Sequence, residues 1–366
     1  MKKILILANG TMSVYHFRRE LIAALVSEGW QVFVSSPEDG FSDELRALGI
    51  TCIDTPLDRH GTNPCRDYAL IRRYRAMIRE LGPKILLTYT IKPNIYGNLA
   101  AKGLNIPVIS VVTGLGDAFL REDMVSRVVK ILYRRALEKT ACVVFLNRED
   151  LEFMRDTRIL AGPGLLLSGG EGVNINEFPA LDYPEASVIS FLYVGRIMRT
   201  KGVGELAEAA RQLRAEYREA FDLTLIGYHD GDIKDKVEQA EAEGVMRYAG
   251  FQKDVRPFVQ TAHCVLLPSY KEGMSVALME AAAMGRPIIA TDIGGCREIV
   301  EDGVNGFLCK PKDVYSLYDC MKRFLSLPAE RRKEMGAASR RRARAEFDRQ
   351  TAVRAMTDLI GDTLQL

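Results

Sequence analysis

The feature of this sequence that most restricts its fold is the stretch 265–290, in which two apolar runs flank a helical segment. The first run is broken by Pro268, the helical segment ends at Gly285, and the second run follows Pro287. Continuous apolar runs of this kind predict strands buried on both faces, and an intervening helix connects parallel strands. We therefore predict a β-α-β unit whose helix starts near Glu272.

Two acidic residues, Glu272 and Glu280, fall at the predicted helix start and two turns further along. Eight residues give a rise of ~12 Å and bring the two side chains to within about 80° of one another around the helix axis. We expect both carboxylates to face one ligand, with the helix start attracting a phosphate or another polyoxygenated group. The simpler alternative is an acidic first turn plus one exposed glutamate.

Length and composition set the broad class. A chain of 366 residues exceeds the size at which one core usually keeps growing, so two domains are expected. The net charge of +2 gives no reason to expect a nucleic-acid partner. No window approaches the ~20 apolar residues of a membrane span, and the short run after Lys3 predicts a strand rather than a signal peptide. Seven scattered cysteines predict reduced thiols in a cytoplasmic protein.

Apolar strands alternate with helices through both halves of the chain. This alternation predicts doubly wound parallel sheets of the α/β class, whose ligands lie beyond the carboxyl ends of the strands. A glycine-rich segment beginning at Ser168 divides the chain into predicted domains 1–172 and 173–345. The helices predicted for the first half include 14–28, 42–48, 68–81 and 94–103.

Polar residues follow several predicted strands of the first half. Gly10 follows the first strand and allows a donor or acceptor to approach the backbone closely. Lys92 and Asn94 follow the strand 85–89, although a helix starting around Pro93 explains them equally well. The candidate acceptor-binding residues are Tyr15, His16, Arg18, Lys92, Asn94, Thr113 and Gly114.

Some of these candidates have more than one interpretation. His16 is a candidate catalytic base and equally a packing residue. Arg18 is expected either to hold an anion or to be solvated. The segment 113–119 superficially resembles a dinucleotide fingerprint, but its third glycine is missing, so we exclude NAD. In this loop Thr113 or Asp117 is expected to reach an acceptor.

Two helices of the first half, around 71–78 and 127–135, mix arginine and lysine with apolar residues. Such helices can lie on an anionic membrane surface, where each basic residue contributes on the order of 1 kcal/mol. They can equally be solvated helices that pack their apolar side on a sheet. We expect membrane contact through them.

Two cations mark the start of the second half. Gly195 and Arg196 end an apolar strand, and Lys201 with Gly202 opens the next helix. At this position an arginine fork and a lysine point charge can clamp a diphosphate. Ordinary surface charge is the alternative.

Together, the Glu-x7-Glu pattern of Glu272 and Glu280 and the Gly-Arg…Lys-Gly pattern resemble the donor site of retaining GT-B glycosyltransferases of family 4. The resemblance implies two Rossmann-like domains facing across a cleft, with a last helix, 346–366, that crosses back to the first domain. It also implies that Glu272 contacts the transferred sugar, Glu280 the nucleotide ribose, and Arg196 and Lys201 the diphosphate. Further donor-binding residues implied are Gly10, Gly195, Phe251, Lys271, Gly273, Met274 and Ser275.

Within that family, segments 15–18, 113–116 and 267–273 are similar to bacterial N-acetylhexosaminyltransferases of undecaprenyl-diphosphate-linked glycan assembly, the group that includes the N-acetylgalactosaminyltransferases of N-glycan assembly. The resemblance implies a UDP-sugar donor such as UDP-GalNAc, and a polyprenyl-diphosphate-linked saccharide acceptor. It also implies a peripheral position on the inner face of the cytoplasmic membrane, with no required metal or other cofactor. A UDP-sugar epimerase of GT-B fold and an inactive membrane-associated scaffold are the alternatives.

Overall fold

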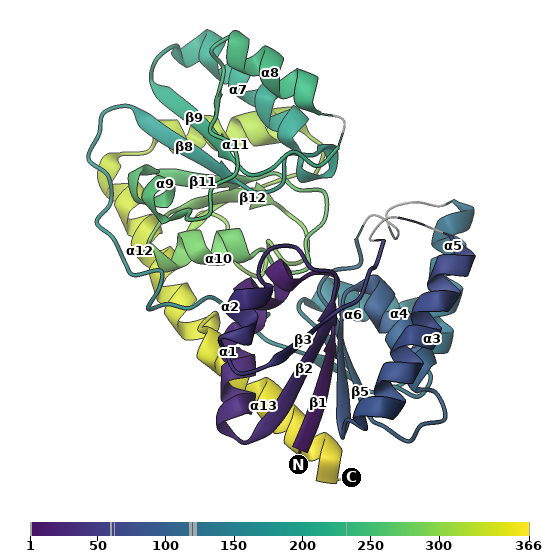
Figure 1. The fold of residues 1–366 in the computed structure, drawn as a ribbon. Coiled ribbons are helices and arrows are strands. Elements are labelled where there is room, and N and C mark those ends of the chain that lie inside the picture. The colour runs from purple at the N-terminus through teal and green to yellow at the C-terminus, as the bar shows by residue number, and fades with distance from the viewer. Residues whose placement is uncertain are drawn as a thin grey trace. The chain divides into compact units, whose positions relative to one another are not determined.

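The computed structural model describes residues 2–58, 61, 63–116, 119, 123–231 and 233–365, in two compact units (Figure 1). Unit 1 consists of Met1–Glu171 and Arg349–Leu366, and unit 2 of Gly172–Asp348. The chain therefore passes between the units twice, after Glu171 and after Asp348.

Unit 1 contains a seven-stranded parallel sheet in the order β3-β2-β1-β4-β5-β6-β7. Its strands are β1 (Lys2–Leu7), β2 (Trp30–Ser36), β3 (Thr51–Asp54), β4 (Ile85–Tyr89), β5 (Val108–Val112), β6 (Cys142–Phe145) and β7 (Gly164–Leu166). Its helices are α1 (Thr11–Ser27), α2 (Ser42–Arg46), α3 (Pro64–Leu81), α4 (Ile91–Ala101), α5 (Met124–Leu137), α6 (Arg148–Asp156) and α13 (Arg349–Gln365).

Unit 2 contains a six-stranded parallel sheet in the order β10-β9-β8-β11-β12-β13. Its strands are β8 (Ile189–Val194), β9 (Phe221–Ile226), β10 (Arg247–Tyr248), β11 (Cys264–Leu267), β12 (Ile288–Thr291) and β13 (Gly306–Cys309). Its helices are η2 (Arg199–Lys201), α7 (Val203–Tyr217), α8 (Lys234–Ala242), α9 (Arg256–Thr261), α10 (Val276–Ala283), α11 (Val314–Ser326) and α12 (Ala329–Glu346).

The two sheets share one topology. In each, the first three strands run outward in one direction and the later strands in the other, so the order reverses between β1 and β4 in unit 1 and between β8 and β11 in unit 2. The predicted parallel, doubly wound sheets are confirmed. In open sheets of this kind, ligands bind beyond the carboxyl ends of the strands at the reversal point.

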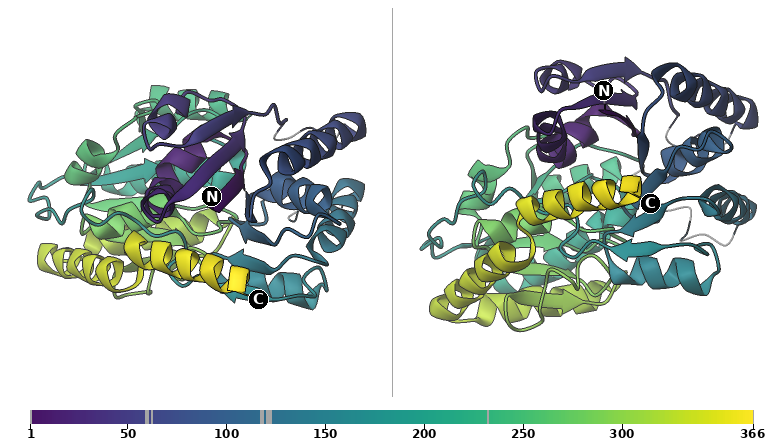
Figure 2. Two further views of the ribbon diagram at one scale, coloured as in Figure 1. Left: turned by 60° about the horizontal axis from the view of Figure 1, so that its bottom comes forward. Right: turned by 90° about the horizontal axis from the view of Figure 1, so that it is seen from below.

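Burial explains why the strands lack polar alternation. All residues of β4, β5, β6, β11 and β12 are buried, because helices cover both faces of each sheet. The C-terminal helix α13, yellow in Figure 2, belongs to unit 1 and packs against α1. No helix in the described part of the chain combines the length and the apolar composition that a bilayer crossing requires.

One prediction for the stretch 265–290 is wrong. The helix begins at Val276, because the Ser275 hydroxyl accepts a hydrogen bond from the Leu278 N–H (3.4 Å) and caps it. Glu272 therefore lies in the preceding loop, and the helical angle that we used to relate it to Glu280 does not apply.

Candidate functional site

The donor-site candidates of unit 2 gather at the reversal point of its sheet. Arg196 lies in the loop after β8, and Glu272 in the loop after the neighbouring strand β11. The Tyr270 N–H donates to the Thr200 carbonyl (2.9 Å) and so joins the two loops. At Gly202, a Cβ would lie 2.0 Å from the Pro268 carbonyl oxygen, so this contact requires glycine.

Four charged side chains from three loops form the centre of this site. Lys201 forms an ion pair with Glu272, and these side chains are only 16% and 11% exposed. The Arg196 Nη1 lies 2.8 Å from an Asp230 carboxylate oxygen, and this pair is 40% and 33% exposed. Arg196, Lys201 and Glu272 thus lie in unit 2, whereas His16, the candidate catalytic base, lies in unit 1.

Tyr193 fixes the backbone beneath Arg196. Its fully buried hydroxyl donates to the Arg196 carbonyl oxygen (2.7 Å). Burial raises the pKa of the Tyr193 phenol well above its ordinary value, and the nearby Glu272 carboxylate adds to this effect. The hydroxyl is therefore a neutral, permanent donor. A Cβ at Gly195 would lie 3.0 Å from this hydroxyl oxygen, which explains the small residue.

The residues after Glu272 have structural contacts of their own. Met274 is buried, and Ser275 is buried with its hydroxyl engaged in the α10 cap. The Gly273 carbonyl oxygen lies 2.5 Å from the position that a Gly295 Cβ would occupy, so the loop after β12 packs against this segment. Lys271 is half-buried in the same loop. Donor contacts from these four predicted residues remain predictions.

An aromatic pair lies beside the charged centre. The Phe251 side chain is 55% exposed, and its ring centroid lies 6.3 Å from that of Tyr228, which follows β9. Two exposed aromatic faces suit a planar base. Glu280 is half-buried in α10. The described residues contain no group of three or more His, Cys, Asp or Glu arranged to hold a metal ion.

At the corresponding edge of unit 1, several polar groups are paired with other side chains of the same unit. The Met12 N–H at the start of α1 donates to an Asp39 carboxylate oxygen (2.7 Å), so a carboxylate already occupies the helix end after Gly10. Arg18 is 3% exposed, forms an ion pair with Glu171 (2.8 Å), and donates to the Ser13 carbonyl. The expectation that Arg18 is solvated is wrong, because this pairing holds its guanidinium in the core.

Asn94 is also part of the core. It is fully buried, and its amide donates to the Val111 carbonyl (3.0 Å) and the Tyr133 hydroxyl (2.8 Å) while accepting from Thr88 (2.7 Å). Every polar atom of the Asn94 side chain is thus engaged inside unit 1, and its contact with an acceptor stays a prediction. The side chain connects β4, β5 and α5.

Two other predicted acceptor residues remain near the surface of that edge. The Lys92 Nζ donates to the Gly61 carbonyl (2.7 Å) and pairs with Asp67 (3.0 Å). Thr113 and Gly114 follow β5 and are half-buried. Asp117 lies outside the described residues.

Aromatic rings cluster on the exposed side of α1. Phe41 lies 5.5 Å from Tyr15 and 5.0 Å from His16, centroid to centroid, and Arg19 lies over the Tyr15 ring. All four are half-buried. This aromatic cluster (Tyr15, His16, Phe41) offers apolar faces to a ligand such as a sugar ring.

The two basic helices of unit 1 differ. On α3, Met77 and Ile78 are buried in the core, so the prediction of an interfacial apolar face there is wrong. On α5, four apolar side chains are 46% to 71% exposed and form what we call the α5 stripe: Met124, Val125, Val128 and Ile131. Its basic residues are Arg127, Lys130, Arg134 and Arg135, and the helix contains no acid.

Comparisons with known proteins agree with this architecture. The family model "Glycosyl transferase 4-like" matches residues 3–147, and "Glycosyl transferases group 1" matches residues 185–342. The chain belongs to the glycosyltransferases. The solved structure of Anabaena HepE with UDP and glucose has a TM-score of 0.81 at 17% identity, covering 99% of this chain and 100% of that one. Sucrose-phosphate synthase from Thermosynechococcus elongatus has a TM-score of 0.80 at 20% identity, covering 99% of both chains. The predicted GT-B fold is confirmed.

The names of two relatives describe transferases that act on undecaprenol-diphosphate-linked sugars. The chain is 27% identical to the N,N'-diacetylbacillosaminyl-diphospho-undecaprenol alpha-1,3-N-acetylgalactosaminyltransferase of Campylobacter jejuni, over 85% of this chain and 86% of that protein. It is 24% identical to the Escherichia coli UDP-Gal:alpha-D-GlcNAc-diphosphoundecaprenol alpha-1,3-galactosyltransferase, over 71% of this chain and 72% of that protein.

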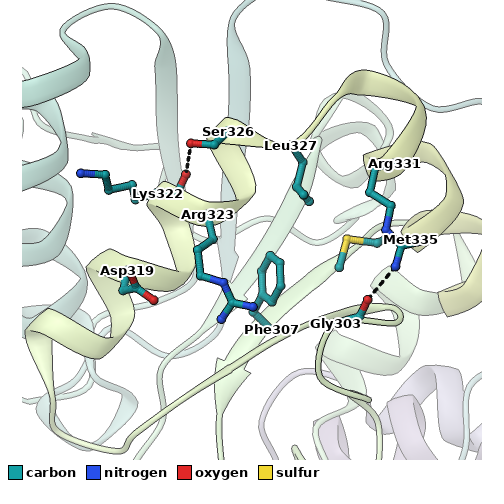
Figure 3. A pocket seen from close by; sticks show the side chains of 9 residues that line it. All are labelled: Gly303, Phe307, Asp319, Lys322, Arg323, Ser326, Leu327, Arg331 and Met335. Atoms are coloured by element: carbon teal, nitrogen blue, oxygen red, sulfur yellow. Dashed lines mark hydrogen bonds between the residues drawn. The ribbon is translucent and has the colours of Figure 1, made fainter.

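A separate hollow of about 500 Å³ lies in unit 2 of this glycosyltransferase (Figure 3). Gly303 and Ser326 place it at the amino ends of the strands, opposite the donor loops. Of the cations there, Lys322 pairs with Glu216, Arg331 pairs with Glu334, and Arg323 lies over the Phe307 ring. None of the predicted site residues lines this hollow.

Sequence reasoning missed three residues of the glycosyltransferase site: Tyr228, Asp230 and Tyr270. Tyr228 and Asp230 follow Gly227 at the carboxyl end of the apolar strand β9, and that position was the available signal. Tyr270 lies inside the stretch 265–290, for which the prediction concentrated on Glu272 and Glu280.

Proposed function

We propose that this glycosyltransferase is a retaining hexosyltransferase of family 4 that moves an N-acetylhexosamine such as GalNAc from a UDP-sugar to a polyprenyl-diphosphate-linked saccharide. The observation that carries the proposal is the meeting of Arg196, Lys201 and Glu272 at the reversal point of unit 2. The donor class is supported by HepE, which was solved with UDP, and the acceptor class by the names of the Campylobacter and Escherichia relatives.

Each side chain of the donor site has a role in this reaction. The bond between the sugar C1 and the UDP oxygen breaks, and a bond from the acceptor oxygen to C1 forms on the same face. Arg196 and Lys201 stabilise the charge that develops on the departing diphosphate, so the proposal requires no metal ion. Glu272 binds hydroxyls of the transferred sugar and Glu280 the ribose. The departing phosphate oxygen accepts the acceptor proton, and His16 then helps to bind the acceptor.

The α5 stripe supports a peripheral position on the inner face of the cytoplasmic membrane. Four exposed apolar side chains beside four basic ones match a surface of acyl chains and anionic headgroups. Such a position gives access to a lipid-linked acceptor of bacterial surface glycan or N-glycan assembly.

The first experiment combines the purified protein, a panel of UDP-sugars and a polyprenyl-diphosphate-linked saccharide extract, with EDTA in place of metal. We expect acceptor-dependent UDP release and a product heavier by one N-acetylhexosamine. Glu272→Ala should abolish most turnover, whereas Glu238→Ala, a change at an exposed acid of α8, serves as the matched control. Release of an epimerised UDP-sugar without acceptor would instead identify an epimerase, and an absence of UDP binding would identify a scaffold.

Membrane contact is tested separately by sedimentation with vesicles containing phosphatidylglycerol. Val128→Ser with Ile131→Ser should reduce the bound fraction, because the buried apolar area is lost. Tyr68→Ser, a change at an exposed ring on α3, is the control. Equal sedimentation of all three proteins would contradict the assignment of α5.

A further inference from the structure

Arg196 has a counter-ion that the proposed reaction does not use. The Arg196 guanidinium contacts Asp230 at 2.8 Å, and this acid comes from the loop after β9 rather than from the two loops that carry the other charges. The pair is more exposed than the Lys201–Glu272 pair, with 40% and 33% against 16% and 11%. Asp230 therefore competes for the cation that we assign to the diphosphate.

The backbone holds Asp230 in this position. The Ile197 N–H donates to the Tyr228 carbonyl (2.9 Å), and the Asp230 N–H donates back to the Ile197 carbonyl (3.1 Å). At Gly227, a Cβ would lie 1.8 Å from the Gly195 carbonyl oxygen, so only glycine permits the two loops to approach this closely. The backbone hydrogen bonds between the two loops therefore hold Asp230 beside Arg196.

The charges of the site show how the Arg196–Asp230 contact affects diphosphate binding. Without donor, Arg196 and Lys201 face Asp230 and Glu272, so the two cations and two acids cancel. A diphosphate that binds Arg196 competes with the Asp230 carboxylate for the same positive charge, and the carboxylate remains near the phosphate oxygens. A partly exposed ion pair is weak enough to be exchanged in this way.

We infer that Asp230 is a competing counter-ion for Arg196 that weakens binding of the nucleoside diphosphate and so favours its release after transfer. The inference rests on the proposed function, because it assigns the diphosphate of UDP to Arg196. Asp230 is thus a positioning residue that acts through the arginine and does not contact the reacting atoms.

The test is a calorimetric titration of UDP alone, at low ionic strength, into five proteins: the unaltered protein, three single variants and one double variant. Asp230→Asn should bind UDP about fivefold more tightly than the unaltered protein, as expected for removal of a partly exposed competing charge. Asp222→Asn, which removes an exposed acid at the opposite end of β9, should leave the Kd unchanged. In the Arg196→Ala background, Asp230→Asn should lose most of its effect. Product inhibition by UDP should strengthen in Asp230→Asn in parallel.

The outcomes separate the two proposals. If the unaltered protein does not bind UDP, both fail. If it binds UDP and Asp230→Asn binds equally or more weakly, the counter-ion role is wrong and a direct ligand contact from Asp230 explains any loss. A gain of the same size with and without Arg196 also overturns the inference, because the effect would then not pass through the arginine. The gain should shrink at ~1 M salt, where charges are screened over about 3 Å.

Discussion

The two units have the same strand order, yet they use the reversal point of the sheet in different ways. In unit 2 the loops after the strands carry the Arg196–Asp230 pair, which is 40% and 33% exposed, and the less exposed Lys201–Glu272 pair. In unit 1 the corresponding polar residues are buried in internal contacts, as with Arg18 on Glu171 and Asn94 on Tyr133. Topology therefore indicates where a ligand site can form, but the burial of each side chain decides whether it is available to a ligand.

The largest expected effect follows from removing a carboxylate in unit 1. Glu171→Ala should lower the free energy of unfolding by about 3–5 kcal/mol, because Arg18 would remain as an unpaired charge in the core. Urea denaturation measures this. Asp43→Ala breaks the exposed pair with Arg46 and should cost less than about 1 kcal/mol. An unchanged midpoint for Glu171→Ala would mean that unit 1 tolerates charges as unit 2 does.

The matching change in unit 2 should reduce turnover. Lys201→Ala should lower kcat/KM by about 10²–10³-fold, because a preorganised charge at the departing diphosphate is lost. Steady-state kinetics with the sugar donor measures the effect, and thermal denaturation checks the fold. Lys236→Ala, at an exposed lysine of α8, is the control. Normal turnover in Lys201→Ala would refute the donor-site assignment.

A third comparison sets the buried Asn94 of unit 1 against the partly exposed Lys92. Asn94→Ala should lower the free energy of unfolding by about 1–3 kcal/mol, since the Thr88 hydroxyl and the Val111 carbonyl lose their buried partner. Lys92→Ala, two residues away but partly exposed, should have a smaller effect. If the order of the two variants in urea denaturation were reversed, the network around Asn94 would not be what stabilises this edge.

The smallest expected effects come from the aromatic residues of each unit. Tyr15→Ala should raise the KM for the acceptor about three- to tenfold and leave UDP affinity unchanged, because it removes one face of the aromatic cluster. Phe251→Ala should instead weaken UDP binding by about 1–3 kcal/mol and leave the KM for the acceptor unchanged. The comparison fails if both variants affect the same substrate.

Much of the fold follows from local sequence. Continuous apolar runs such as those of β4 and β11 predicted buried parallel strands, because strands covered on both faces need no polar alternation. The start of α10 was misplaced, because the acidic Glu272 resembles a first-turn residue whereas Ser275 provides the cap. The Gly-Arg…Lys-Gly spacing correctly placed two cations at the carboxyl edge of one sheet.

The fate of individual polar residues was harder to predict. Arg18 meets Glu171, which lies 153 residues away, and Asn94 meets Tyr133 on another helix. A local pattern contains no information about such partners. Asp230 was missed for the same reason, since its meaning depends on Arg196 in a different loop.

The division of the chain has a consequence for the order in which the protein is made. Unit 2 is one continuous segment, whereas unit 1 needs α13, which packs against α1 and brings Arg349 to within 3.1 Å of Glu20. During synthesis, the face of α1 that α13 covers therefore stays uncovered until α13 leaves the ribosome. We expect unit 2 to become protease-resistant first on stalled nascent chains, and a chaperone to bind the uncovered α1 face.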